Sequence, residues 1–159
     1  MWFFKLLGVA ALVCSGMATS YELNRRASAA LQQNEAMMAL IRTVRGQIEC
    51  FARPISEILS TCAESDLVAC GYLYSDVPSD LSEFAGKCIS YDEETMQIVL
   101  RFAEEFGRGY REDEVRGCDY VLTLLDERRA CLAAEIPVKK KRNCVLAVCA
   151  ALAMAIFLL

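Results

Sequence analysis

All but one of the charged residues are confined to the middle of this chain, and that segregation constrains its fold more than any other feature. All 21 acidic residues and 16 of the 17 basic residues lie between Tyr21 and Arg142. The flanking stretches, 1–20 and 143–159, are almost wholly apolar, and 144–159 has no charged side chain. An apolar stretch of about 17–25 residues is long enough to cross a bilayer as a helix. The pattern predicts a transmembrane helix at 1–20, a polar domain at 21–142 and a transmembrane helix at 143–159.

A basic cluster gives the expected orientation of the second span. Four cations directly precede the last apolar stretch: Lys139, Lys140, Lys141 and Arg142. Lysine and arginine accumulate on the cytoplasmic side of membrane helices. We therefore expect these four residues to set the membrane orientation, with the polar domain in the cytoplasm.

The first apolar stretch has two interpretations. Lys5 followed by LLGVAALV and a small-residue site at 16–18 is typical of a cleaved signal peptide. Arg25 and Arg26, just after the stretch, favour a retained helix with its cationic flank in the cytoplasm. We expect retention, and the exported alternative stays open.

The polar domain is predicted to be helical. Between Leu23 and Leu59 an apolar side chain recurs at spacings of four and three, which is the pattern of a helix with one buried face. The polar residues between these positions are expected to be exposed. Pro54 either kinks this helix or opens a second one, and the second interpretation gives PISEILSTCAE a clean start. The predicted buried stripe is Met37, Ile41, Val44, Ile48, Phe51, Ile55 and Ile58, continued more weakly upstream by Leu23, Ala27, Ala30 and Asn34.

Three further helices are expected after a turn-rich stretch at 71–82. A short one lies at 80–88. The next begins with Ser90 as its N-cap and Glu93 three residues later. Its expected buried face is Met96, Val99, Phe102, Ala103 and Phe106.

The last predicted helix follows two glycines. Gly107 and Gly109 permit the positive φ that ends a helix, and Glu112 or Asp113 can begin the next. Pro137 is expected to close this helix before the basic cluster. Its apolar face is predicted at Val115, Cys118, Leu122, Leu125, Leu132 and Ile136, with Arg129 as the one polar position. The predicted fold class is all-α: a cytoplasmic helical bundle flanked by an N-terminal and a C-terminal transmembrane helix.

No catalytic or cofactor-binding motif stands out. The chain has no histidine, which removes the usual general base near neutral pH. Its nine cysteines show no CxxC spacing; in a reducing cytosol they are small apolar core residues, whereas in an oxidising compartment the six between 50 and 131 could form disulfides. Cys118 lies on the apolar stripe and is expected to be a buried, inert thiol, and the paired carboxylates are expected to face solvent.

The same features set the expected partners. The middle segment carries a formal charge of −5, which argues against nucleic acid as a partner. We predict no enzyme activity, cofactor or metal, and a protein that binds its neighbours.

Two stretches resemble the stage III sporulation AB proteins of endospore-forming bacteria. They are VRGQIECFARPISEIL at 44–59 and EETMQIVLRFAEEFGRGYREDEVRGCDYVLTLLDERR at 93–129, between apolar ends with a basic-then-apolar tail. Residues at the places typical of the family are Gln47, Ile48, Glu49, Pro54, Ile55, Glu57, Phe102, Phe106 and Gly107.

The resemblance implies a non-enzymatic scaffold of the secretion-like channel between mother cell and forespore. It implies a location in the cell membrane on the mother-cell side of the forespore membrane. It also implies a soluble part similar to the cytoplasmic helical domain of the type II secretion platform protein. The partners implied are the lipid bilayer, a cytoplasmic secretion-type ATPase and other membrane components of the complex, with homo-oligomers possible. We expect the ATPase contacts at Arg108, Arg111, Glu112 and Glu114.

Two other interpretations remain at this stage. One is an exported, disulfide-bonded helical domain with a cleaved signal peptide and a C-terminal anchor. The other is a regulatory tail-anchored protein with no link to secretion.

Overall fold

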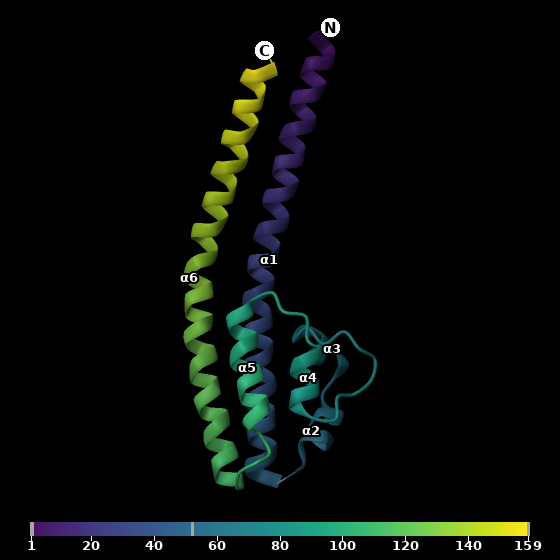
Figure 1. Cartoon of the computed structure of the whole chain (residues 1–159), viewed down its shortest axis with the longest axis vertical. Coiled ribbons are helices and arrows are strands. Elements are labelled where there is room, and N and C mark those ends of the chain that lie inside the picture. The colour runs from purple at the N-terminus through teal and green to yellow at the C-terminus, as the bar shows by residue number, and fades with distance from the viewer. Residues whose placement is uncertain (1, 52, 159) are drawn as a thin grey trace. The chain divides into compact units, whose positions relative to one another are not determined.

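Six α-helices make up the computed structural model of the chain (Figure 1). The structure describes the backbone of residues 2–51 and 53–158, and the side chains of 15, 18–51, 53–150 and 153. No strand occurs in this part of the chain, so the predicted all-α class is confirmed. The helices are α1 (Trp2–Phe51), α2 (Ile55–Thr61), α3 (Glu64–Ala69), α4 (Leu81–Lys87), α5 (Glu93–Glu105) and α6 (Arg111–Leu158).

The chain divides into two compact units. The bundle is the unit Ala30–Cys131, and the arm is the unit formed by Met1–Ala29 and Leu132–Leu159. Within the arm, the amide Nδ2 of Asn143 donates a hydrogen bond of 3.2 Å to Oδ1 of Asn24, which joins α6 to α1.

Over the described residues, no helix combines the length and the apolar character that a membrane crossing requires. The two expected membrane helices, 1–20 and 143–159, extend into side chains outside the described set, namely 1–14, 16–17, 151–152 and 154–159. Both spans therefore stay predictions.

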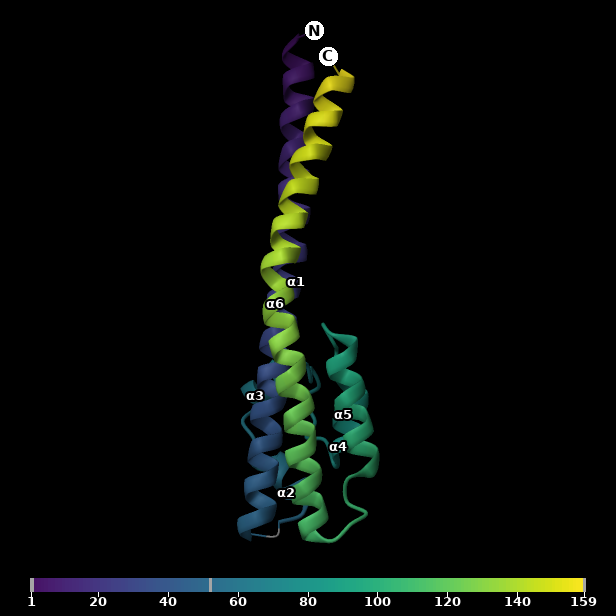
Figure 2. The ribbon, with the colours of Figure 1, turned by 90° about the vertical axis from the view of Figure 1, so that its left-hand side faces the viewer.

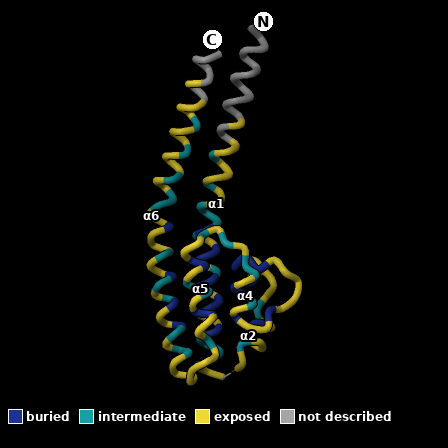
Figure 3. The backbone as a smooth tube through the Cα atoms, in the orientation of Figure 1, coloured by how far each residue is buried: buried dark blue, intermediate teal, exposed yellow. Residues whose placement is uncertain are grey.

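The core of the bundle follows the predicted stripe on α1. Met37, Ile41, Val44 and Ile48 are all buried, and dark-blue positions gather where the helices of the bundle face one another (Figure 3). The prediction for Phe51 was wrong, because this side chain is 64% exposed. Phe51 is the last residue of α1, so the chain turns away before a neighbouring helix can cover it.

Pro54 opens a second helix, as one of the two sequence interpretations held. It is the N-cap of α2, and its carbonyl oxygen accepts hydrogen bonds from the backbone N–H groups of Glu57 and Ile58. Proline suits this place because its missing N–H would have no helical partner there. The stretch that follows is split between α2 and α3 by a break at Cys62–Ala63.

The short helix expected at 80–88 is confirmed as α4, which packs against α5 (Figures 1 and 2). The cap predicted for α5 was wrong: Asp92, not Ser90, is its N-cap, and the Asp92 carboxylate accepts from the backbone N–H of Thr95. The Ser90 hydroxyl donates instead to the carbonyl of Asp92, two residues on, within the preceding turn. Serine and aspartate both cap helices well, so residue type alone does not decide between Ser90 and Asp92.

The turn between α5 and α6 uses one left-handed glycine instead of two. Gly107 has φ +83°, whereas Gly109 is not in the positive-φ region. A Cβ at Gly109 would lie 3.2 Å from Cβ of Asp113, so close approach accounts for this glycine. α6 begins at Arg111, slightly before the predicted Glu112 or Asp113.

The prediction that Pro137 closes the last helix was wrong, because α6 continues through it. A proline inside a helix removes one backbone hydrogen bond and strains the preceding turn. Pro137 is exposed, so water can satisfy the freed carbonyl, and good helix-forming residues lie near it on both sides, at 133–135 and at 139–142. The local penalty therefore weakens the helix without ending it.

Gln33 holds the loops of the bundle together. The sequence interpretation placed such polar residues of α1 at the surface, but Gln33 is 2% exposed. Its Nε2 donates to the carbonyl oxygens of Cys70 (2.8 Å) and Ile89 (2.7 Å), and its Oε1 accepts from the backbone N–H of Tyr91 (2.9 Å). One side chain thus fixes both ends of the connection that contains α4.

Candidate partner-binding site

The residues predicted to contact a partner lie around the turn between α5 and α6. Arg108, Arg111 and Glu112 are exposed there, and the two arginine side chains form no ion pair or hydrogen bond with any described residue. Tyr110 between them is 85% exposed, the highest exposure among the large apolar side chains described. The turn therefore presents two unpaired cations around an aromatic ring.

Glu114 has a structural task in that turn. Its Oε1 accepts hydrogen bonds from the backbone N–H groups of Gly107 (3.0 Å) and Gly109 (2.9 Å). A carboxylate in the first turn of α6 also interacts favourably with the positive end of the helix dipole. Of the four predicted contact residues, Glu114 is thus committed to holding the other three in place.

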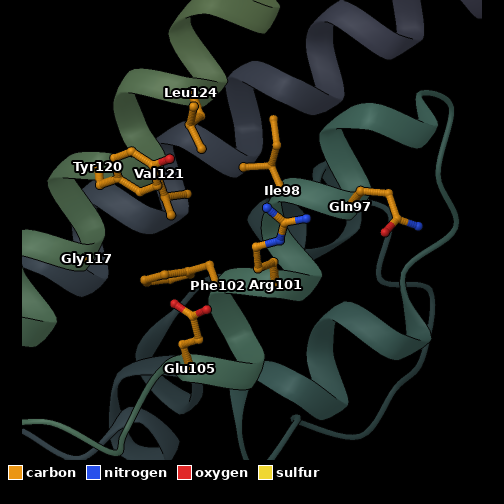
Figure 4. A pocket seen from close by; sticks show the side chains of 9 residues that line it. All are labelled: Gln97, Ile98, Arg101, Phe102, Glu105, Gly117, Tyr120, Val121 and Leu124. Carbon is orange, nitrogen blue, oxygen red and sulfur yellow. The ribbon is translucent and has the colours of Figure 1, made fainter.

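A groove lies between α5 and α6 within the bundle (Figure 4). Its volume is about 170 Å³, close to the roughly 150 Å³ cavity that accommodates one benzene ring in a protein interior. Apolar side chains form much of its lining, and Gly117 contributes no side chain. The lining residues are Gln97, Ile98, Arg101, Phe102, Glu105, Gly117, Tyr120, Val121 and Leu124.

The rim of the groove carries one unpaired charge of each sign. Arg101 and Glu105 are exposed, lie one turn apart on α5, and form no ion pair with each other or with another described residue. Tyr120 on α6 is 66% exposed and adds an aromatic face. An apolar floor with a mixed-charge rim and an exposed aromatic ring is typical of sites that bind another protein.

A buried polar chain fixes the start of α5, and hence one wall of the groove. Arg128 on α6 donates to both carboxylate oxygens of Asp92 at 2.8 and 2.6 Å, and also pairs with Glu94 at 2.5 Å. Asp92 accepts from the hydroxyl of Thr95, which in turn accepts from Nδ2 of Asn34 on α1. The Arg128 guanidinium holds the pKa of Asp92 at about 2, below the usual value of an aspartate.

The sequence interpretation chose the neighbouring residue for this role on α6. Arg129 was expected to be the polar position of the buried register, but it is exposed and pairs only with Asp126 one turn earlier. Arg128 is the half-buried one, with its side chain 16% exposed. The side chains of adjacent residues leave a helix about 100° apart. Polar residues interrupt the apolar stripe of α6 near these two arginines, so the stripe does not show which of them faces the bundle.

The cysteines of the described part are all free. Burial raises the pKa of Cys118 to about 12, so the prediction of a buried thiol that does not ionise at neutral pH is confirmed. Burial raises the pKa values of Cys70 and Cys88 to about 12 as well. Among the described residues, no group of three histidine, cysteine or acidic side chains could hold a metal ion.

The basic cluster lies in the arm, apart from the groove residues in sequence. Lys139 Nζ pairs with Glu135 at 2.6 Å, and Lys140, Lys141 and Arg142 are exposed. No observation on the described residues tests whether these four cations set a membrane orientation.

The groove itself was missed at the sequence level. Glu105 was assigned to a solvated face and Arg101 was not singled out. The sequence does not show whether an exposed charged residue on a helix forms an ion pair. Gly117 offered the one available signal. A glycine inside a strong helix pattern, away from any turn, indicates that another group packs closely against the helix or that space is left beside it.

The fold and these surfaces define an all-helical bundle whose exposed features are suited to contact with another protein. The family model of stage III sporulation protein AB matches residues 5–159, nearly the whole chain. The chain belongs to this family of stage III sporulation proteins, as the resemblance of its sequence indicated. Neither the curated proteins nor the solved structures compared with the chain contain a significant match.

Proposed function

We propose that this sporulation protein is a membrane-anchored, non-enzymatic platform that docks a cytoplasmic ATPase of the same complex. The observation that carries the proposal is the α5–α6 groove, with an apolar floor and the unpaired charges of Arg101 and Glu105 on its rim. Membership of the stage III sporulation AB family supports a place in an assembly between mother cell and forespore.

The docking surface in this proposal extends from the groove to the turn. Arg108, Arg111 and Glu112 provide accessible charges, and Tyr110 provides an aromatic contact. Interface energy concentrates on aromatic and arginine residues that enter or border a pocket. We therefore place the strongest contacts at Arg101 and Tyr120, with the turn residues at the periphery.

The membrane anchoring in the proposal comes from the charge pattern of the sequence. Residues 1–20 and 143–159 would cross the cell membrane on the mother-cell side of the forespore membrane, which leaves the bundle in the cytoplasm. The four cations at 139–142 favour this orientation. Other membrane components of the complex would then contact the two spans.

A charge swap tests the docking role. The double substitution Arg101→Glu/Glu105→Arg reverses the rim at constant net charge, so any loss reports the groove and not long-range attraction. We expect recovery of the ATPase with the full-length, detergent-solubilised chain to fall about tenfold, equivalent to about 1.4 kcal/mol. Gly117→Leu, which fills the groove with an apolar side chain, should have a comparable effect.

The matched control is Glu35→Arg/Arg42→Glu. Both of these residues are exposed on α1, and neither forms an ion pair with a described residue. The control should leave recovery within about twofold of the unmodified chain. Equal recovery with the swapped rim, the filled groove and the control would refute docking at this groove.

A further inference from the structure

The hydrogen bond between Asn24 and Asn143 sets the register of the two helices in the arm. α1 and α6 run in opposite directions (Figure 1). Both asparagines are half-buried where their side chains meet. Counting outward from this contact, Arg25 lies level with Arg142, and Arg26 lies level with Lys141. These pairs are 117 and 115 positions apart in the sequence, and the antiparallel register places each pair at one level along the arm.

Six cations therefore surround the helix pair within about one turn, since each residue adds about 1.5 Å along a helix. Successive positions on a helix are about 100° apart, so the four residues at 139–142 encircle α6 instead of sharing one face. We call this group the cation collar: Arg25, Arg26, Lys139, Lys140, Lys141 and Arg142.

The collar is poorly neutralised by the protein itself. Arg25 and Arg26 share the single carboxylate of Glu22, at 3.8 and 3.5 Å, and the two arginine side chains are 73% and 68% exposed. Lys139 pairs with Glu135. Six positive charges against two carboxylates within about a Debye length repel one another, so an anionic partner would lower the free energy of this segment.

The sequence on either side identifies the anion. Charge ceases on both helices just beyond the collar: 6–21 on α1 and 143–159 on α6 have no charged side chain. If these stretches are the membrane spans of the proposed function, on which this inference rests, the collar lies in the plane of the lipid headgroups. We propose that the cation collar binds the anionic headgroups of membrane phospholipids.

The test uses the full-length chain reconstituted in vesicles of phosphatidylcholine with a minor fraction of phosphatidylglycerol. Lipid retained by the protein after gentle detergent extraction is measured by mass spectrometry. We expect phosphatidylglycerol to be enriched about fivefold over its share in the vesicle, since juxtamembrane cations attract anionic lipid headgroups. Lys140→Gln/Lys141→Gln/Arg142→Gln should bring the enrichment close to one.

The matched control removes three exposed cations from the bundle: Arg42→Gln/Arg53→Gln/Arg116→Gln. It should retain the enrichment of the unmodified chain, and equal loss in both triple variants would overturn the collar as the site. Inorganic phosphate added at millimolar concentration should not compete. Displacement of the lipid by phosphate would show a general anion site and would also overturn the proposal.

Resistance to carbonate extraction from pure phosphatidylcholine vesicles separates this inference from the proposed anchoring. A chain that resists extraction but shows no enrichment of phosphatidylglycerol refutes the collar and leaves the anchoring standing. A chain that carbonate removes refutes the anchoring, and the lipid inference with it.

Discussion

At the scale of single residues, Asp92 combines two structural tasks. Its carboxylate caps the N-terminus of α5 through the backbone N–H of Thr95, and it accepts two hydrogen bonds from the Arg128 guanidinium. The carboxylate is 12% exposed and the guanidinium 16%. Removing the Asp92 charge would leave the nearly buried guanidinium with only the exposed Glu94 as its counter-charge, and breaking one partner of a buried ion pair is destabilising.

The stability of the bundle should consequently fall in acid. Arg128 lowers the folded-state pKa of Asp92 to about 2, below an unfolded value of about 3.9. A depressed folded pKa contributes stability that is complete above the unfolded pKa and is lost as the pH falls toward the folded one. We expect urea midpoints to decline between about pH 4 and pH 2.

Asp92→Asn should lower the free energy of unfolding at pH 7 by about 2 kcal/mol and flatten that decline. Asp126→Asn, which alters an exposed pair on the same helix as Arg128, is the control and should keep both the stability and the acid slope. An unchanged acid slope in Asp92→Asn would contradict the assignment.

Residue-level predictions from the sequence succeeded for most apolar positions and failed for several polar ones. The spacing predicted the buried positions Met37, Ile41, Val44 and Ile48 on α1 and Met96, Val99, Phe102 and Ala103 on α5, because apolar side chains gain free energy wherever they are covered. Leu23 and Phe51 of the same predicted stripe are exposed. Gln33 was assigned to the surface, since its burial depends on three backbone groups at Cys70, Ile89 and Tyr91 that only the folded loops bring together.

At the scale of elements, glycines and prolines were the residues whose effect depended most on context. Pro54 starts a helix as predicted, whereas Pro137 lies inside one. The chain at Pro54 already leaves α1, while residues on both sides of Pro137 favour helix. The groove could not be predicted because it is a space between two helices. Both helices were expected, but which side chains face that space depends on how the helices are rotated and shifted against each other.

Two glycines should respond in opposite directions to alanine. A Cβ at Gly117 would meet Cε2 of Phe102 at 3.7 Å, an ordinary contact, so Gly117→Ala should stabilise α6 by about 0.5–1 kcal/mol and raise Tm by roughly 3–6 °C. At Gly71 the backbone has φ +97°, and a Cβ would collide with Gln33 Nε2 and the Ile89 carbonyl oxygen. Gly71→Ala should lower stability by about 2 kcal/mol or more.

Thermal unfolding of both variants, followed by circular dichroism, checks this pair. Each serves as the control of the other, because both add the same methyl group. A loss of stability in Gly117→Ala would mean that the groove is closed tighter than its contacts indicate.

At the scale of the whole molecule, the division into the arm and the bundle has a practical consequence. The main core cluster lies within Ala30–Cys131, and its members come from all six helices. A core of this kind can fold without the arm, since few of its apolar contacts depend on residues outside it.

We predict that a fragment of residues 28–134, which keeps the buried Leu132, unfolds in a single cooperative transition. A domain of about 100 residues should do so with an enthalpy of roughly 60–80 kcal/mol. Calorimetry and far-ultraviolet circular dichroism measure it. Leu125→Asp, at a fully buried position, should abolish the transition, and a broad, non-cooperative melt of the unmodified fragment would contradict the prediction.

The amide of Gln33 also has a kinetic consequence. The Gln33 side chain forms hydrogen bonds with backbone groups at both ends of the connection between Cys70 and Tyr91. Neither end can therefore detach alone without leaving a buried polar group without a hydrogen bond. The segment between Cys70 and Tyr91 should therefore open as one cooperative unit, and its slowly exchanging amide protons should show a common free energy of opening in hydrogen exchange. The whole of α4 would thus move with the rotamer of a glutamine some fifty residues away.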